Sequence, residues 1–222
     1  MICAEGLYFS YTGTAPWILN NLCFTAEDGE YISIVGSNGA GKSTLVKLLL
    51  GLLSPLRGSI SVTQDRTAFV PQANDLADSH FPVTVREMLD SYRRLLKIKD
   101  RNRTDEALAA VGMQAVSDRL ISTLSGGQRQ KVFIARGIIG DPSLLVLDEP
   151  SAGVDPESRK EIYAYLKKLN SEKTVTILSV EHNLDAVVRN STAIYHMSGG
   201  SGHMCSPETY RRELVFAGGG AV

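Results

Sequence analysis

Apolar and polar positions change their spacing along the chain, and each kind of spacing predicts a different element. Residues 2–10 and 22–26 alternate apolar and polar side chains, which is typical of strands with one buried face. Residues 31–35 and 144–147 are almost continuously apolar, as expected for strands buried on both faces of a parallel sheet. The run 174–178 has the same texture, so we expect a third buried strand there.

Helical spacing dominates the middle of the sequence, from residue 81 to about residue 116. Apolar residues recur there every three or four positions: Val85, Met88, Leu89, Tyr92, Leu95, Leu96, Ala107, Leu108 and Val111. A shorter pattern after residue 44 predicts another helix with Leu45, Leu48, Leu49 and Leu52 on its apolar face. The long central stretch therefore predicts a helical subdomain between two blocks of α/β texture.

The second α/β block contains a helix with clear start signals. Asp155 can cap it and Pro156 suits its first turn. Its predicted apolar face consists of Ile162, Tyr165, Leu166 and Leu169. Short strands are expected at 59–63, 67–70, 192–197 and 203–205, and a last helix from Pro207, with fraying at the glycines 218–220.

These elements predict an α/β fold in one domain of 222 residues. We expect a mixed, largely parallel core sheet with an antiparallel β part near the N-terminus. Residues 1–80 and 140–222 would form this core, and residues from about 81 to 139 the helical subdomain.

Charge and cysteine content narrow the function. The net charge is −1, with 23 basic and 24 acidic side chains, so we expect no broad electrostatic attraction to nucleic acid. We see neither an apolar run of membrane-spanning length nor a secretory signal, and expect a soluble, unexported chain. Cys3, Cys23 and Cys205 are scattered, which argues against disulfides and indicates a reducing compartment.

The strongest motif follows the apolar run 31–35 and precedes the helical pattern. It reads Gly36, Ser37, Asn38, Gly39, Ala40, Gly41, Lys42, Ser43 and Thr44. A glycine-rich turn between a strand and a helix directs backbone N–H groups and the helix dipole at one anion. Lys42 can reach the β- and γ-phosphates of a nucleotide, and the Ser43 hydroxyl can bind Mg²⁺. The motif predicts a P-loop NTPase fold, and a glycine-rich turn without a ligand is the disfavoured alternative.

A second helix start has the same kind of chemistry. Leu124, Ser125, Gly126, Gly127 and Gln128 precede a helix whose apolar face we assign to Val132, Phe133, Ala135, Arg136 and Ile139. Ser125 and Gln128 have capping-box spacing, and the two glycines leave backbone N–H groups accessible to a phosphate. Inside a compact domain this helix end cannot easily reach the first loop's ligand. We therefore expect it to serve the nucleotide of a second copy; an ordinary capped helix is the alternative.

Two carboxylates follow the buried run 144–147. Asp148 would hold Mg²⁺ at the sheet edge, and Glu149, pointing the other way along the pleat, can polarise an attacking water. The alternative is a solvated strand end with no ligand.

With these motifs in this order, the chain resembles the ATP-binding-cassette (ABC) transporter ATPases over almost its full length. The resemblance implies that Tyr11, rather than Trp17, stacks on adenine. It implies that Gln72 contacts Mg²⁺ and the water, and that His182 contacts the γ-phosphate. It also makes Ser151, Ala152, Gly153, Val154 and Asp155 a D-loop that crosses the dimer interface.

One departure from the family pattern lies beside His182. The family usually has a hydroxyl residue before this histidine and Asp after it, whereas Glu181 and Asn183 stand here. The predicted set is then catalytic Lys42, Gln72, Glu149 and His182, with Mg²⁺ ligands Ser43, Gln72 and Asp148.

Within the family, the chain is similar to the ATPases of zinc and manganese importers. The similarity lies in residues 78–85, in Gly153 and Val154, and in the ending 196–208. His196, His203, Met204 and Cys205 are interpreted as strand positions without a ligand role, because their spacing matches no closed zinc site.

We therefore expect an ATPase subunit that works as a dimer with two composite ATP sites and drives a membrane permease, importing zinc or manganese. Iron chelate, cobalt or another small solute is the alternative cargo. The partners would be a second copy, integral membrane permease subunits and, indirectly, a substrate-binding protein, on the cytoplasmic face of the membrane. A DNA-repair ATPase is opposed by the mere 81 residues between Lys42 and Leu124. A module that binds ATP without turnover is disfavoured by Lys42, Glu149 and His182.

Overall fold

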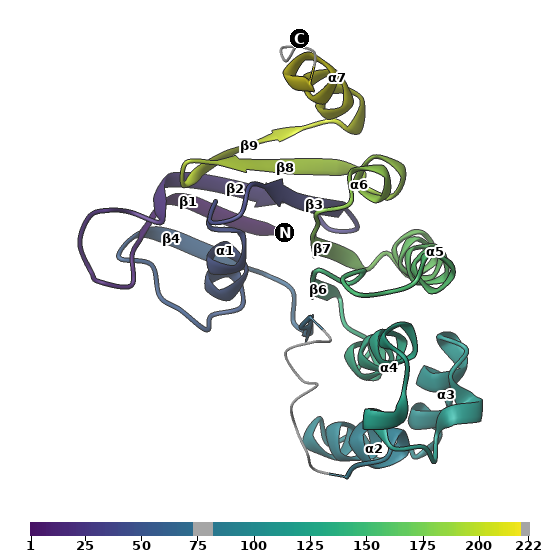
Figure 1. Cartoon of the computed structure of the whole chain (residues 1–222). Helices are drawn as coiled ribbons and strands as arrows, with labels where there is room; N and C mark the ends of the chain where they lie inside the picture. The colour runs from purple at the N-terminus through teal and green to yellow at the C-terminus, as the bar shows by residue number, and fades with distance from the viewer. Residues whose placement is uncertain (73–81, 219–222) are drawn as a thin grey trace. The chain divides into compact units, whose positions relative to one another are not determined.

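Two compact units make up the chain in the computed structural model, residues 1–65 with 176–222 and residues 66–175. The structure describes residues 1–72 and 82–218 (Figure 1). Part of the segment 78–85, whose sequence resembles metal importers, and most of the expected glycine tail lie outside the described residues. The boundaries expected for the helical subdomain, about 81–139, stay a prediction.

The first unit begins with an antiparallel sheet, as the alternating pattern predicts. Strand β1 (Ile2–Phe9) pairs antiparallel with β2 (Leu19–Ala26) on one side and with β4 (Arg57–Val62) on the other. Buried side chains alternate along β1 on either side of a register shift between Ala4 and Leu7: Ile2, Ala4, Leu7 and Phe9. The predicted antiparallel β part is confirmed.

A parallel sheet forms the rest of this unit. Strand β3 (Tyr31–Gly36) lies between β7 (Thr176–Val180) and β8 (Ala193–Ser198) and is parallel to both. Strand β9 (Ser201–Cys205) pairs antiparallel with β8. The helices of the unit are α1 (Lys42–Leu49), α6 (Leu184–Asn190) and α7 (Pro207–Gly218).

The second unit combines a short parallel strand pair with helices. Strands β5 (Thr67–Val70) and β6 (Leu144–Asp148) are paired in parallel. The α-helices are α2 (Val85–Leu95), α3 (Asn102–Ala110), α4 (Gly126–Ile138) and α5 (Pro156–Lys173), and the 3₁₀ turns are η2 (Gln114–Val116) and η3 (Ile121–Thr123). A capping box of Thr84 and Glu87 starts α2. The predicted fold class, with its mixed and largely parallel core, is thus confirmed.

Three predicted core positions are exposed instead. Leu52, the last residue of the apolar face predicted for α1, is 64% exposed because the helix already ends at Leu49. Leu95 and Leu96 are also exposed, at the last turn of α2. The buried residue of that turn is Arg93, whose guanidinium is satisfied by Asp90 and by the backbone carbonyl of Ile98.

The predicted apolar face of α4 is buried except at Arg136, but the burial extends beyond that face. Its buried residues include Gln130 and Lys131 as well as the apolar side chains, so it is buried almost all round. Lys131 tolerates this position because its ammonium pairs with Glu161 of α5. On α5, Tyr163 is buried where the pattern pointed to Tyr165, which is only half-buried.

The strand expected at residues 174–178 begins two residues later. Helix α5 continues to Lys173, and Thr174 ends it in the left-handed region at φ +54°. This conformation is unusual for a β-branched residue, so a run rich in Thr and Val gives no sign of it.

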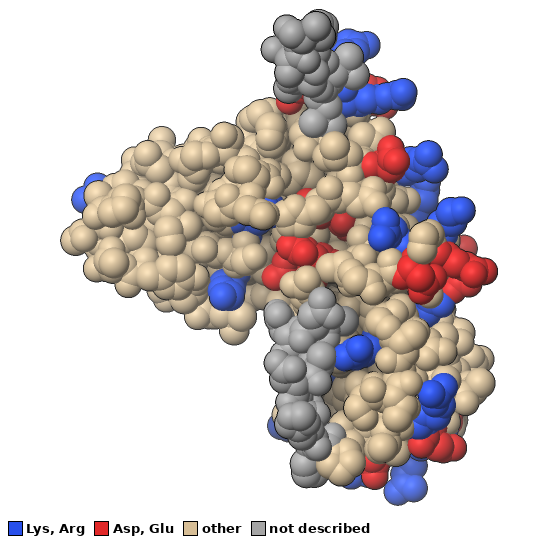
Figure 2. Space-filling view, viewed as in Figure 1, with Lys and Arg blue, Asp and Glu red and all other residues tan. Residues whose placement is uncertain are grey.

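Two surface properties bear on function. In the part of the chain that the structure describes, we find no helix that is long and apolar enough to cross a lipid bilayer. On the face drawn in Figure 2, basic and acidic side chains are intermixed. Helix α5 illustrates this mixture, because Lys168 and Glu172 pair on its exposed side.

Candidate functional site

The glycine-rich loop starts where β3 ends, and its first residue has to be glycine. Gly36 has φ +151°, and a Cβ there would lie 2.3 Å from the backbone oxygen of Met197 on the neighbouring strand β8. The chain can therefore turn out of the sheet only without a side chain at this position. Ser37, Asn38 and Gly39 are exposed after the turn, while Ala40 and Thr44 are buried and anchor the loop.

The helix that follows this loop starts without a side-chain cap from any described residue. Its N-cap is Gly41, in a left-handed conformation at φ +97°. The Lys42 ammonium is buried and donates to the carbonyls of Gly36 and Ser37 at 2.8 and 3.0 Å. Ser43 is exposed. The first N–H groups of α1 can therefore donate to an anion, and the Ser43 hydroxyl can bind the cation that accompanies it.

His182 follows strand β7, the parallel neighbour of β3, so His182 and the glycine-rich loop lie at the same carboxyl-terminal edge of the sheet. The imidazole is exposed. Its unusual neighbours have structural roles: Glu181 is buried and accepts a 2.7 Å hydrogen bond from Ser179, and Asn183 caps α6 by accepting from the N–H of Ala186. Asn183 therefore does the capping that Asp would do in the family pattern.

The two aromatic candidates near the loop differ in accessibility. Tyr11 is 63% exposed and touches Phe9 edge-on at 5.1 Å. Trp17 is half-buried against Tyr8, with the Arg57 guanidinium 6.0 Å from its ring centre. The more accessible ring is that of Tyr11.

In the second unit, the end of β6 brings two predicted residues together. Asp148 and Glu149 are half-buried, and the side-chain amide of Gln72, just after β5, donates to the Glu149 carboxylate at 3.4 Å. Glu149 has φ +47°, a conformation that costs a non-glycine residue about 1–3 kcal/mol and clusters at functional sites.

The turn after Glu149 is held by its own hydrogen bonds. The Tyr163 hydroxyl of α5 lies 3.0 Å from the Ser151 hydroxyl, and Asp155 caps α5 by accepting from the N–H of Ser158 at 2.9 Å. These hydrogen bonds from Ser158 hold the pKa of the Asp155 carboxyl below its usual value. The cap predicted for Asp155 is confirmed.

The start of α4 shows the predicted capping box. The Ser125 hydroxyl accepts from the N–H of Gln128 and the Gln128 side chain accepts from the N–H of Ser125, both at 3.2 Å. Ser125 itself is exposed. The box confirms the spacing argument and leaves the amides of Gly126 and Gly127 as the remaining donors of this helix start.

The two glycines have a further role that sequence reasoning missed. A Cβ on Gly126 would lie 2.7 Å from the carbonyl oxygen of Gly153, and one on Gly127 would lie 2.5 Å from the Ser158 hydroxyl. Gly127 is buried against α5, and whether its N–H binds a phosphate stays a prediction. Both glycines let the start of α4 pack on the turn 151–155 and on α5, a contact between distant segments that no local pattern reveals.

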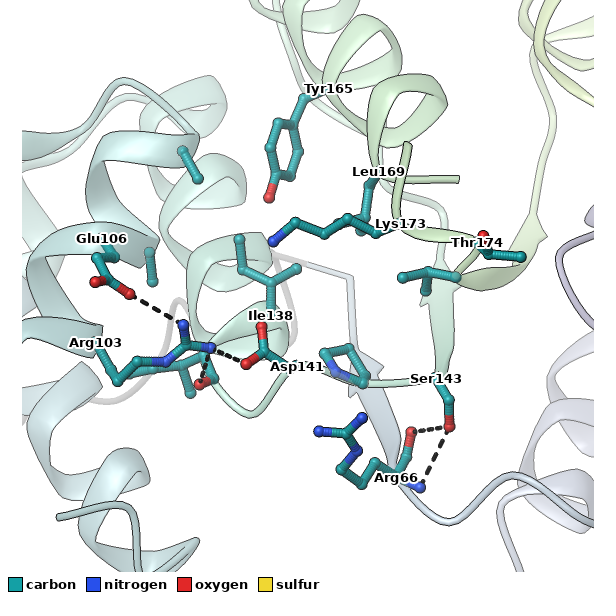
Figure 3. A pocket seen from close by; sticks show the side chains of 15 residues that line it. Arg66, Arg103, Glu106, Ile138, Asp141, Ser143, Tyr165, Leu169, Lys173 and Thr174 are labelled. Atoms are coloured by element: carbon teal, nitrogen blue, oxygen red, sulfur yellow. Dashed lines mark hydrogen bonds and ion pairs between the residues drawn. The ribbon is translucent and has the colours of Figure 1, made fainter. Parts of the chain in front are cut away.

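A cavity of about 360 Å³ within residues 66–175 holds none of these motif residues. Figure 3 shows Arg103 between Glu106 and Asp141, with Lys173 and Tyr165 on the other side. Burial and the charge of Asp141 raise the pKa of Tyr165 to about 12. The basic side chain of Arg103 is already paired inside the protein, so this hollow is not the predicted nucleotide site.

Comparison with known proteins shows the family of the chain. A family model described as "ABC transporter" matches residues 19–152. The chain is 50% identical over 214 residues to a probable metal transport system ATP-binding protein of Treponema pallidum, covering 96% of this chain and 90% of that protein. It is 40% identical over 194 residues to the zinc uptake system ATP-binding protein ZurA of Listeria innocua, covering 80% of this chain and 76% of that protein.

Among solved structures, the fold matches one described as an inward-facing conformation of a putative metal-chelate type ABC transporter. The TM-score is 0.84 at 28% identity, with 94% of this chain and 84% of that chain covered.

Proposed function

Because the chain belongs to the ABC transporter family, we propose that it is the ATP-hydrolysing subunit of an importer for a divalent metal ion, zinc or manganese. The observation that carries the cargo assignment is the high identity to a metal transport ATP-binding protein along nearly the whole length of both chains. The strained Glu149 with Gln72 beside it supports hydrolysis rather than binding alone.

Nucleotide binding follows from the loop between β3 and α1. Lys42 exchanges its carbonyl partners for the β- and γ-phosphate oxygens, while the loop backbone from Gly36 to Thr44 donates N–H groups to them. The accessible ring of Tyr11 stacks on adenine.

The side chains predicted to bind a magnesium ion all carry oxygen donors. Ser43 offers an exposed hydroxyl at the start of α1, and Asp148 and Gln72 offer oxygens at the ends of β6 and β5. Oxygen ligands of this kind are those that Mg²⁺ prefers, together with phosphate oxygens. Bound there, the ion would neutralise charge that develops on the phosphates.

Hydrolysis assigns separate tasks to three side chains. The Glu149 carboxylate accepts a proton from the attacking water, and Gln72, which already donates to that carboxylate, orients the water. His182 donates to the γ-phosphate. Each of these residues acts on the water or the transferred phosphoryl group, so losing one lowers turnover without removing the nucleotide-binding loop.

A second copy completes each site. The exposed Ser125 and the start of α4, from Gly126 to Gln128, donate to the γ-phosphate held by the other subunit's loop, and the turn 151–155 crosses between the copies. Closure of this dimer on ATP drives permease subunits fed by a substrate-binding protein, on the cytoplasmic face of the membrane. The permease docks on the segment 72–85, of which 73–81 lie outside the described residues.

Reconstitution tests the proposal. The chain is co-purified with its permease subunits and placed in vesicles that hold ATP, with the substrate-binding protein added outside. Uptake of radioactive zinc or manganese is measured for wild type and for Glu149→Gln, with Glu157→Gln as the control. We expect metal uptake in wild type and the control, and none in Glu149→Gln. If uptake follows an iron chelate or cobalt instead, the cargo assignment is wrong while the ATPase assignment stands.

A further inference from the structure

The hairpin at the end of the parallel sheet brings two histidines to one place. Strand β8 pairs antiparallel with β9, and His196 lies directly opposite His203 in that register. Their ring centres are 5.5 Å apart. The cross-strand pairing, and not the spacing along the sequence, creates this pair.

Helix α7 supplies a carboxylate to the same place. Figure 1 shows this helix following β9 directly. Glu213 lies 3.9 Å from Nδ1 of His196 and 4.0 Å from Nε2 of His203, through one oxygen for each ring. The three ligand atoms lie within 4.8 Å of one another. Neither distance is short enough for a hydrogen bond, so direct hydrogen bonding does not explain the cluster.

One atom of the cluster is in an unusual state. Nδ1 of His196 is buried, and among residues 1–72 and 82–218 it has no hydrogen-bond partner. A buried polar atom without a partner is costly and calls for an explanation such as an ion. The ring is fixed in place by Tyr210, whose ring centre lies 5.4 Å away and which is buried in the apolar cluster of Val35, Val187 and Ile194. The nitrogen is thereby directed toward Glu213.

We propose that His196, His203 and Glu213 bind a first-row divalent cation, Zn²⁺ in particular. Ligand atoms within 4.8 Å of one another need only small side-chain rotations to converge on one cation at about 2 Å, the length of a zinc bond to imidazole or carboxylate. Two imidazoles with one carboxylate favour zinc-like ions over Mg²⁺ and Ca²⁺, which prefer all-oxygen sites. Three protein ligands leave a further coordination position for water.

The neighbouring sulfur side chains are not part of this site. Met204 alternates with His203 along β9, so it points to the other face of the hairpin. Cys205 packs against the apolar cluster, and burial raises the pKa of its thiol, which disfavours the thiolate that metals bind. The proposal therefore revises the sequence interpretation for the two histidines alone and adds Glu213. The proposed metal site shares no residue with the P-loop, and the proposal is independent of the proposed cargo.

Metal binding by the purified full chain tests the proposal. The protein is stripped of metal, kept free of nucleotide, and titrated with Zn²⁺ in competition with a chromogenic chelator. We expect wild type to bind one Zn²⁺ tightly, and His203→Ala and Glu213→Gln to bind it at least ten times more weakly. Glu208→Gln, an exposed carboxylate of the same helix, and Met204→Leu are the controls and should bind like wild type.

Two further measurements separate loss of a metal ligand from loss of the fold. Circular dichroism checks that the variants are folded, as expected for side chains that are 58% and 44% exposed. The visible spectrum of bound Co²⁺ should show imidazole and carboxylate ligation that His203→Ala alters. The proposal is overturned if wild type binds no Zn²⁺ at micromolar concentration, if the two variants bind it like wild type, or if Cys205→Ser alone abolishes binding.

Discussion

We propose that two helix starts in this chain bind phosphate, and they are built differently. Helix α1 begins at a left-handed glycine, and none of the described side chains caps it. Helix α4 begins with a complete capping box, in which Ser125 and Gln128 satisfy each other. The first start therefore keeps its backbone donors for a ligand, whereas the second satisfies part of its own.

Because of this difference, we expect the starts of α1 and α4 to act in different steps of nucleotide binding. The open start of α1 has a buried lysine beside it and suits tight binding of nucleotide by a single copy. The start of α4 keeps only the amides of two glycines and the exposed hydroxyl of Ser125, too few donors to hold a triphosphate alone. It is suited to recognise a γ-phosphate that another copy already holds. The same contrast predicts that substitutions at the two starts affect different steps.

The largest expected effect is at the open start. Lys42→Ala removes the charge that contacts the β- and γ-phosphates and also the two hydrogen bonds to the loop carbonyls. We expect affinity for a fluorescent ATP analogue to fall at least about a hundredfold, since charge-assisted contacts are the strong ones. Lys47→Ala, an exposed lysine of the same helix, is the control. Unchanged affinity in Lys42→Ala would remove the P-loop from the account.

A smaller effect is expected at the capped start, and on a different step. Ser125→Ala should cost about 1 kcal/mol of stability as a lost cap, and should leave ATP affinity of the single copy unchanged. Thr84→Ala is the matched control, because Thr84 forms the same box with Glu87 at α2. We expect a similar loss of thermal stability in both variants but a tenfold or greater loss of ATPase rate only in Ser125→Ala. Equal ATPase rates would make the box of α4 merely structural.

The smallest effect concerns the turn against which α4 packs. The pKa of Asp155 is lowered by hydrogen bonds from Ser158, so this carboxylate stabilises the fold above its unfolded pKa of about 3.9. The contribution is lost as pH falls through the lower folded pKa. Asp155→Asn keeps a good cap without the charge, so its thermal midpoint should depend less on pH below about pH 4 than that of wild type. Identical pH curves for the two proteins would contradict the prediction.

The sequence predicts what is local and misses what depends on packing. The loop 36–44, the box of Ser125 with Gln128 and the cap at Asp155 are set by neighbouring residues, and the structure has the predicted local geometry at each. The burial of Lys131 depends on Glu161 of another helix, and that of Gly127 depends on Ser158. No periodicity encodes such partners.

The contact between Gln72 and Glu149 was predicted only in part. The motifs name both residues, but the positive φ of Glu149 is unexpected for a residue with a long side chain. The cluster of His196, His203 and Glu213 needs strand register and a helix position together, so spacing along the chain points away from it.

The central claim is that the loop before α1 in one copy and the start of α4 in the other bind the same ATP. The most direct test is the oligomeric state of the Glu149→Gln variant with and without ATP. Light scattering after gel filtration should find wild type monomeric without nucleotide, since each site lacks the other copy's Ser125. The amide removes the base but keeps the binding loop, so turnover should fall by about 10²–10⁴. With ATP, the variant should elute as a dimer containing two ATP molecules, while Glu157→Gln behaves like wild type. A variant that binds ATP as a monomer, or hydrolyses it at a near wild-type rate, would contradict the account.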